Sequence, residues 1–401
     1  MSLYDVAVIG GGASGITAAI FAARCGAKTV ILEKNARIGK KILATGNGRC
    51  NLLNANLSED RFYGDREFVK KAFYNFPLSD MLSFFESIGL PCTELENGKM
   101  YPKSLQATSV LDLLREELSR LGVEILTDFE VKSAEKTKNG FKLISSNGFI
   151  SAKKMIFACG GAAAPQFGTD GSAYKLLTSM GFKMKKTFPA LVQLQTENTP
   201  KALAGLKTDA AATLFVNGKK IKSTFGEVLF TNYGISGPPI FDLSRQVSEA
   251  LEKVDTPEIS IDLLSDIPYH ELTELLSARQ KQFSYLKPEN FLNGLLPKKL
   301  GAEIYKRAKT PRDMAQLIKN FKFKVIKTMG FKNAQVTAGG ICTCEVLPET
   351  FMSKKQKDLY ITGEMLDIDG DCGGFNLSFA WCSGALAGQD AGCEYKNDKS
   401  R

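Results

Sequence analysis

Three glycines and one acid in the first part of the chain have the types and spacing that hold a dinucleotide. Gly10, Gly12 and Gly15 follow an apolar run at 5–9, and Glu33 ends a second apolar run. In this pattern the first glycine permits a tight turn, the second lets the backbone approach a pyrophosphate, and the third lets helix and strand pack closely. The carboxylate can accept hydrogen bonds from ribose hydroxyls. These residues therefore predict binding of a nucleotide cofactor.

Three further features favour FAD over NAD as that nucleotide. One buried strand ends at 158–160 after a β-meander, and another ends in Gly363-Glu364, where the acid can hold sugar-alcohol hydroxyls. A last helix opens at 374–376, so its free N–H groups and positive dipole end would face the flavin edge on which negative charge develops. The candidate cofactor-binding residues are Gly10, Gly12, Ala13, Ser14, Gly15, Glu33, Lys34, Lys40, Thr45, Gly46, Asn47, Arg49, Cys50, Asn51, Val131, Gly160, Gly363, Glu364, Asp369, Gly374, Phe375 and Asn376.

No catalytic residue is assigned from the sequence. The chain has one histidine, His270, so a serine or cysteine hydrolase would have to depend on it alone. Tyr101 and Tyr233 could donate a proton to a reduced substrate. The nine cysteines form no framework, and Cys342-x-Cys344 is the one close pair, so no metal site is expected.

The composition is that of an ordinary globular chain, with 401 residues, 44% of them hydrophobic and 24% charged. The first residues lack the basic segment of a signal peptide. No apolar stretch reaches the roughly 18 residues that span a membrane. Scattered free cysteines fit a reducing compartment. We therefore expect a cytoplasmic protein with no membrane partner.

The net charge of +9 is concentrated between Lys298 and Lys332, where eleven basic residues are opposed by Glu303 and Asp313. Such a segment could hold nucleic acid or another polyanion. No RNA-binding or DNA-binding signature accompanies it, so a solvated helical face is the favoured interpretation. A nucleic-acid partner is accordingly not expected, and the oligomeric state is left open.

The surrounding elements predict an α/β fold: a split Rossmann-like FAD-binding domain with an inserted β-barrel-like module and a helical module. The composition changes near residue 188, where short alternating strands begin and an Asn217-Gly218 turn joins two of them. The expected bounds are 1–189 and 335–401 for the FAD-binding domain and 190–334 for the inserted domain, which is β-barrel-like at about 190–262 and 321–334 and helical at about 263–320.

The segments that carry a family resemblance are 8–15, 32–34, 39–41, 45–51, 226–231, 234–238, 337–340, 363–370, 373–377 and 380–381. In these segments the chain resembles bacterial FAD flavoproteins that include a bile-acid-inducible flavoprotein reductase and aminoacetone oxidase. The resemblance implies FAD, a split Rossmann-like domain with inserted modules, and packing of Cys50 in the flavin loop. Asn232 stands where family members often carry histidine, and Cys372 where they often carry another residue.

We therefore expect an FAD-dependent oxidoreductase that transfers hydride at the flavin and acts on a small organic substrate. One interpretation is NAD(P)H-dependent reduction of an enone such as a 3-oxo bile acid or steroid. The alternatives are oxygen-dependent oxidation of an amine such as aminoacetone, and an RNA-binding or tRNA-modifying flavoprotein. Because the sequence shows no second G-x-G-x-x-G, NADH or NADPH would reach the flavin only transiently as electron donor.

Overall fold

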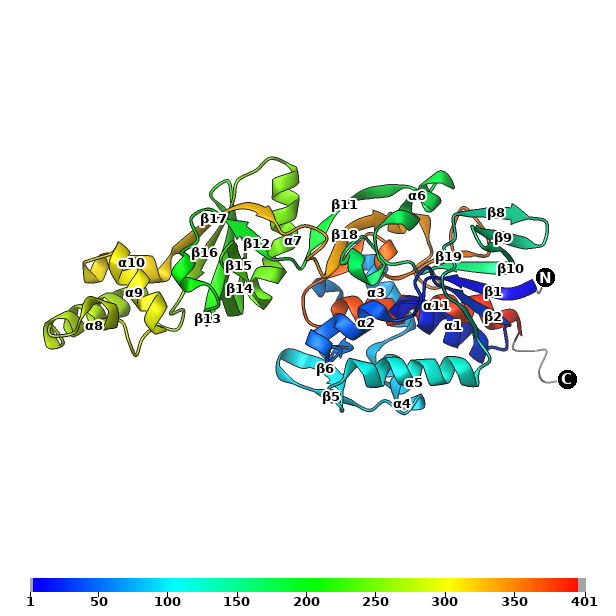
Figure 1. The fold of residues 1–401 in the computed structure, drawn as a ribbon, viewed down its shortest axis with the longest axis horizontal. Coiled ribbons are helices and arrows are strands. Elements are labelled where there is room, and N and C mark those ends of the chain that lie inside the picture. The colour runs from blue at the N-terminus through cyan, green and yellow to red at the C-terminus, as the bar shows by residue number, and fades with distance from the viewer. Residues whose placement is uncertain (1–2, 396–401) are drawn as a thin grey trace. The chain divides into compact units, whose positions relative to one another are not determined.

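The computed structural model describes residues 3–395, and they form two compact units (Figure 1). The first unit contains the chain up to Thr187 together with the segment from Val336 onward. The second unit is Phe188–Gln335. Each unit has its own cluster of buried apolar side chains. The first unit is therefore assembled from two distant parts of the sequence.

A twisted sheet forms the centre of the first unit. Strands β1 (Leu3–Ile9), β2 (Thr29–Leu32) and β7 (Glu124–Leu126) run parallel, and β10 (Gly148–Phe157) extends this parallel arrangement on the other side of β1. The free edge of β10 is shared between two partners: its first half pairs antiparallel with β9, and its last residues pair parallel with β19. These two partners are β9 (Gly140–Ser145), which also pairs with β8 (Ser133–Thr137), and β19 (Leu359–Ile361).

The register brings four strand ends together. Ile9 is paired with both Leu32 and Phe157, and Phe157 is paired with Ile361. Since parallel strands point their carboxyl ends toward the same edge, the loops that follow these four residues meet there. The sequence after each strand, at 10–15, 33, 158–160 and 362–364, contains Gly10, Glu33, Gly160 and Glu364 among the candidate residues.

Helices α1 (Ala13–Arg24) and α11 (Phe375–Gly392) pack closely against each other in this unit. Gly384, Gly388 and Gly392 lie four residues apart on one face of α11. A methyl group on Gly388 would overlap the carbonyl oxygen of Ala18 in α1. This row of glycines lets the two helix backbones approach, so the C-terminal helix fixes the helix that follows the glycine turn.

Smaller elements complete the first unit. Its other helices are α2 (Lys40–Ala44), α3 (Arg66–Asn75), α4 (Leu78–Ser87), α5 (Ala107–Arg120) and α6 (Ser172–Ser179). Its short sheets are formed by β3 (Leu53–Asn54), β6 (Lys99–Pro102) and β5 (Cys92–Glu94), by β4 (Phe62–Gly64) and β20 (Ile368–Gly370), and by β11 (Met184–Ala190) and β18 (Val336–Ile341).

The second unit contains a closed barrel with strand order β12-β15-β14-β13-β16-β17. The strands are β12 (Leu194–Thr196), β13 (Lys207–Val216), β14 (Lys219–Phe230), β15 (Gly234–Ser236), β16 (Pro257–Asp262) and β17 (Phe321–Thr328). Asn217 (φ 50°) and Gly218 (φ 79°) form the expected tight turn between β13 and β14. Phe230, Phe321 and Phe323 contact one another inside the barrel.

Four helices accompany the barrel, namely α7 (Pro238–Glu252), α8 (Tyr269–Gln282), α9 (Lys298–Arg307) and α10 (Pro311–Lys319). Figure 1 shows α8, α9 and α10 grouped together beside the barrel. The predicted fold class, a Rossmann-like α/β domain with barrel and helical modules, is therefore confirmed. Across residues 3–395, the search for a helix long and apolar enough to cross a membrane finds none.

Candidate functional site

The glycine turn after β1 has the geometry that the sequence pattern requires. Gly10 has a φ of 104°, and a methyl group there would press against the backbone of Ala158. A methyl group on Gly15 would overlap the carbonyl oxygen of Gly10. Gly12 differs, because a methyl group there would meet no atom within 4 Å. Gly10 and Gly15 thus allow close packing. Gly12 leaves open space beside the first turn of α1, where Ala13 is the first helical residue.

Glu33 closes the turn from the end of β2. It is buried, and its carboxylate accepts hydrogen bonds from the backbone N–H of Gly11 and of Asn35, each at 2.8 Å. Carboxylate oxygens carry further lone pairs, so these bonds orient the group without exhausting it. The Glu33 carbonyl accepts from the Phe129 N–H at 2.9 Å, two residues before Val131. The segment that carries Val131 is therefore joined to the Glu33 backbone two residues before Val131.

Lys34 forms an ion pair with Asp170 at 2.8 Å. Partial burial would raise the pKa of Asp170, but hydrogen bonds from Lys34 and Ser172 more than offset it and lower the pKa to about 2. Gly160 lies in the same loop region with a φ of 73°, and a methyl group on it would meet the Thr169 side chain. The loop after β10 is therefore tied to the residue that follows Glu33.

The second glycine loop has an unusual backbone. Gly46 (φ 57°), Asn47 (φ 55°) and Cys50 (φ 57°) all adopt left-handed conformations. Thr45 holds the loop, because its hydroxyl donates to the Ile42 carbonyl at 2.6 Å and its carbonyl accepts from the Cys50 N–H at 3.0 Å. Burial raises the pKa of the Cys50 thiol to about 11 although Thr45 acts in the opposite direction. The thiol is thus buried and protonated at neutral pH.

Two basic residues of this region differ in their surroundings. Lys40 lies 3.4 Å from the Asn35 Oδ1, close to the acid of the first loop. The Arg49 guanidinium lies 5.1 Å from the centre of the Tyr101 ring. Burial raises the pKa of Tyr101 and the positive charge of Arg49 lowers it, with burial the larger cause. Tyr101 is therefore protonated at neutral pH.

Glu364 follows β19 and is held from two sides. Its Oε2 forms an ion pair with Lys41 at 2.8 Å, and its Oε1 accepts from the Thr337 N–H at 2.8 Å. Tyr174 donates its hydroxyl hydrogen to the Glu364 carbonyl at 3.1 Å. A methyl group on Gly161 would lie 2.9 Å from the Glu364 Oε1. The second acid is therefore adjacent to the loop after β10, as Glu33 is to the first turn.

The residues before Glu364 join both parts of the first unit. Ser14 Oγ and Thr362 Oγ1 lie 2.5 Å apart and both side chains are buried. Gly363 has a φ of 64°, and its N–H donates to Ser383 Oγ at 2.9 Å. The start of α1, the end of β19 and the middle of α11 therefore converge on one position.

The start of α11 rests on the second glycine loop. Gly374 precedes the helix with a φ of 100°. The first hydrogen bond of the helix runs from the Ser378 N–H to the Gly374 carbonyl. Asn54 donates to the Gly373 carbonyl at 2.8 Å, and Trp381 donates to the Leu52 carbonyl at 3.0 Å. The N–H groups of 375–377 precede the first helical bond, so they remain available to a ligand.

Three candidates near α11 have side chains that are buried or hydrogen-bonded within the protein. The Asn376 side chain accepts from the Gly370 N–H and donates to the Gly370 carbonyl, each at 2.8 Å. Phe375 is buried, with the Arg61 guanidinium 4.9 Å from the centre of its ring. Asp369 lies buried in β20. We expect any cofactor contact from these residues to come from their main chain.

Several residues of the site were not singled out by the sequence. Lys41 and Thr337 hold Glu364, and Thr362 and Ser383 hold the end of β19, through the bonds described above. Thr362 directly precedes Gly363-Glu364, so the position before the acid was a signal that could have been used. The others are ordinary polar residues whose role depends on pairing across the chain.

The remaining chemical candidates include two residues of the second unit. His270 is an exposed residue of α8, 3.8 Å from Glu271, and Tyr233 belongs to the second unit. All nine cysteines are free thiols. In the region that the structure covers, 3–395, no group of His, Cys, Asp and Glu side chains suits a metal ion.

The basic stretch 298–332 is partly neutralised within the second unit. Its ion pairs include Lys319 with Asp262 at 2.7 Å, Lys322 with Glu258 at 2.8 Å, Lys324 with Glu197 at 2.9 Å and Arg307 with Glu303 at 2.7 Å. These pairs support the interpretation of a solvated surface for that part of the stretch.

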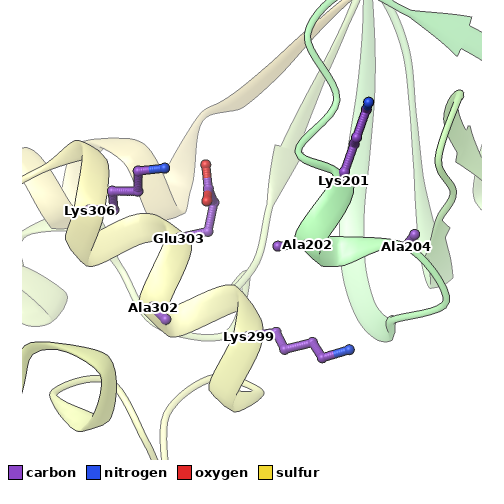
Figure 2. A pocket seen from close by; sticks show the side chains of 7 residues that line it. All are labelled: Lys201, Ala202, Ala204, Lys299, Ala302, Glu303 and Lys306. Carbon is purple, nitrogen blue, oxygen red and sulfur yellow. The ribbon is translucent and has the colours of Figure 1, made fainter.

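Other lysines of the stretch line a hollow. Lys299 and Lys306 of α9 face the short turn Lys201–Leu203, and Lys201 contributes a third ammonium group (Figure 2). The hollow has a volume of about 460 Å³ and contains one acid, Glu303. Within residues 3–395, no ion pair is formed by these three lysines. A cluster of like charges that is left unpaired favours an anion.

Comparison with known proteins places the chain in a family. It matches the family described as HI0933-like protein Rossmann domain over residues 4–390. It is 39% identical to the 3-dehydro-bile acid delta(4,6)-reductase of Clostridium scindens, over 96% of this chain and 98% of the relative. It is 28% identical to the ribosomal RNA dihydrouridine synthase of Haemophilus influenzae, over 96% of this chain and 97% of the relative.

A solved structure shares the fold. The 3-ketosteroid delta1-dehydrogenase of Sterolibacterium denitrificans superposes with a TM-score of 0.54 at 11% identity, covering 98% of this chain and 100% of that chain. The family match and the reductase relative each cover nearly the whole chain, and they show that this chain is an oxidoreductase of the flavoprotein class with a Rossmann domain. The chain belongs to the HI0933-like protein Rossmann domain family.

Proposed function

We propose that this chain is an FAD-dependent reductase that acts on a carbon–carbon double bond conjugated to a ketone, as in a 3-oxo bile acid or steroid. The observation that carries the proposal is the 39% identity, over nearly the whole of both chains, to a 3-dehydro-bile acid delta(4,6)-reductase. The glycine turn, the two acids and the start of α11 support FAD as the cofactor.

The residues present fit FAD on three structural grounds. The open space at Gly12 leaves room for a pyrophosphate, and the first turn of α1 supplies N–H groups and a positive dipole end beside it. Glu33 and Glu364 are held in place by backbone N–H groups, ready to accept hydroxyl hydrogens at the ribose and the sugar-alcohol chain. The N–H groups of 375–377 would stabilise negative charge on the reduced ring.

When bound, FAD supplies hydride transfer, and saturating a conjugated double bond requires one hydride and one proton. Tyr101, protonated and beside Arg49, is a candidate for the proton. NADH or NADPH is proposed as the electron donor. We expect anaerobic mixing with NADH or NADPH to bleach the flavin absorption, and an enone added afterwards to restore it.

The same experiment separates this proposal from its alternative. A flavin that neither NADH nor NADPH reduces, but that an α-aminoketone reduces and oxygen reoxidises, would make the chain an amine oxidase. A purified protein that is colourless and takes up no added FAD would contradict both. A separate test of the cofactor site is the Glu364→Gln variant. A neutral amide replaces the second acid there, and the affinity for FAD should fall.

A second candidate function is modification of RNA by the same flavin chemistry. It is favoured by the lysine-lined hollow of Lys201, Lys299 and Lys306 and by the similarity to a ribosomal RNA dihydrouridine synthase. We expect any such RNA binding to weaken steeply with salt and to fall in a Lys201→Gln/Lys306→Gln variant. A Lys138→Gln/Lys357→Gln variant, at two exposed positions of the other unit, provides the charge-matched control. Absence of a salt-sensitive gel shift with ribosomal RNA would contradict it.

A further inference from the structure

Asn51 carries a buried oxygen that no residue of the described range 3–395 satisfies. Its Oδ1 is shielded from solvent, and no hydrogen-bond donor among residues 3–395 reaches it. Buried acceptors are almost always paired, because leaving one unpaired costs about 1–3 kcal/mol. The position of this oxygen therefore calls for a donor that the polypeptide does not supply.

The oxygen lies directly against the start of α11. A methyl group built on Gly374 would lie 2.9 Å from Asn51 Oδ1. The loop that carries Asn51 is fixed there, because the Leu52 carbonyl accepts from Trp381 and the Asn54 side chain donates to Gly373. An acceptor and a row of helix N–H donors therefore stand side by side at one place.

We propose that Asn51 Oδ1 accepts a hydrogen bond from the imide N3–H of the flavin ring. This inference depends on the proposed FAD cofactor and assigns one contact within its site. The pyrimidine edge of a flavin presents the acceptors N1 and C2=O next to the donor N3–H. The α11 N–H groups at 375–377 match the acceptors, and the adjacent Asn51 oxygen matches the donor.

The pattern also fixes the direction of the ring. With N3–H toward Asn51 and the N1–C2=O edge toward α11, the negative charge of the reduced ring develops at the helix N-terminus. Asn51 is neutral, so it contributes to affinity and orientation, and it acts as a positioning residue. An aspartate at this position would add a negative charge beside the ring and should lower the reduction potential.

The test compares FAD with N3-methyl-FAD, which lacks the donor. We expect the wild-type protein to bind N3-methyl-FAD about tenfold more weakly than FAD in a fluorescence titration, since a net hydrogen bond of this kind contributes about 1–1.5 kcal/mol. In Asn51→Ala the affinity for FAD should fall by a similar factor, and the preference for FAD over N3-methyl-FAD should disappear. Asn56→Ala, an exposed asparagine of the following segment, should keep the preference.

The outcomes distinguish this inference from the proposed function. Equal affinity of the wild-type protein for FAD and N3-methyl-FAD overturns the role of Asn51 while leaving FAD in place. Failure of unmodified FAD to bind overturns the proposed cofactor itself, and the inference with it. The wild-type comparison needs no variant, so it stands even where Asn51→Ala fails to fold.

Discussion

Ser14 Oγ and Thr362 Oγ1 lie 2.5 Å apart in the interior, although 348 positions separate them in the chain. Ser14 belongs to the first turn of α1, and Thr362 follows β19. The contact therefore joins the two sequence segments of the first unit, two residues before Glu364. The coupling energy between these two hydroxyl groups therefore measures how much the two segments stabilise each other.

We expect Thr362→Val to lower the free energy of unfolding by about 1–2 kcal/mol, because Ser14 Oγ would lose its buried partner. Ser14→Ala should cost a similar amount, and the double variant should cost less than the sum, with a coupling of about 1 kcal/mol in urea unfolding. Thr17→Val is the control, since the Thr17 hydroxyl bonds only within α1, to the Ala13 carbonyl. Additive losses would show that the two hydroxyls do not interact.

The same substitution should lower FAD affinity at Gly12 and the stability of the fold at Gly15. Gly12→Ala places a methyl group in open space, so the melting temperature of the FAD-free protein should stay unchanged while FAD affinity falls at least tenfold. Gly15→Ala forces a methyl group onto the Gly10 carbonyl and should destabilise the fold by about 1–3 kcal/mol. Calorimetry and FAD titration check both. Unchanged FAD binding in Gly12→Ala would contradict the pyrophosphate assignment.

The Lys34–Asp170 ion pair predicts a pH effect in acid. The pKa of Asp170 is about 2 in the folded protein against an ordinary 3.8, so its contribution is present above pH 4 and disappears as the pH falls toward 2. Asp170→Asn should therefore lower stability at pH 5 by less than about 1 kcal/mol, since the pair is partly exposed, and by progressively less at pH 4 and pH 3. Asp266→Asn, at an exposed position of the second unit, is the control. A stability difference between the wild-type protein and Asp170→Asn that grows as the pH falls toward 3 would contradict this prediction.

The thiols should fall into reactive and protected groups. Cys344 and Cys393 are exposed, whereas Cys50 is buried with its pKa raised to about 11 by burial. At pH 8 we expect a disulfide reagent to modify the first two quickly and Cys50 only after unfolding in guanidinium. A Cys344→Ser/Cys393→Ser variant should lose the fast phase. Rapid labelling of Cys50, located by mass spectrometry, would contradict its role as a packing group.

The sequence alone determined the local parts of this protein. The glycine turn at 10–15, the acid at Glu33 and the Asn217-Gly218 hairpin were predictable because each depends on neighbours within one turn or one strand pair. The Rossmann-like fold class and the inserted barrel followed from the order of such elements. The basic stretch 298–332 was likewise visible in the sequence as a cluster of lysine and arginine residues.

Only the tertiary structure decided which of those parts touch. Glu33 and Glu364 come to one edge because the strand ends that precede them are in register: Leu32 pairs with Ile9, Ile9 with Phe157, and Phe157 with Ile361. The sequence could not show that Asn376 uses its side chain on Gly370, or that Asn51 keeps a buried oxygen unpaired. Contacts between distant residues depend on strand register and helix packing, which are set by the whole buried core and not by local spacing.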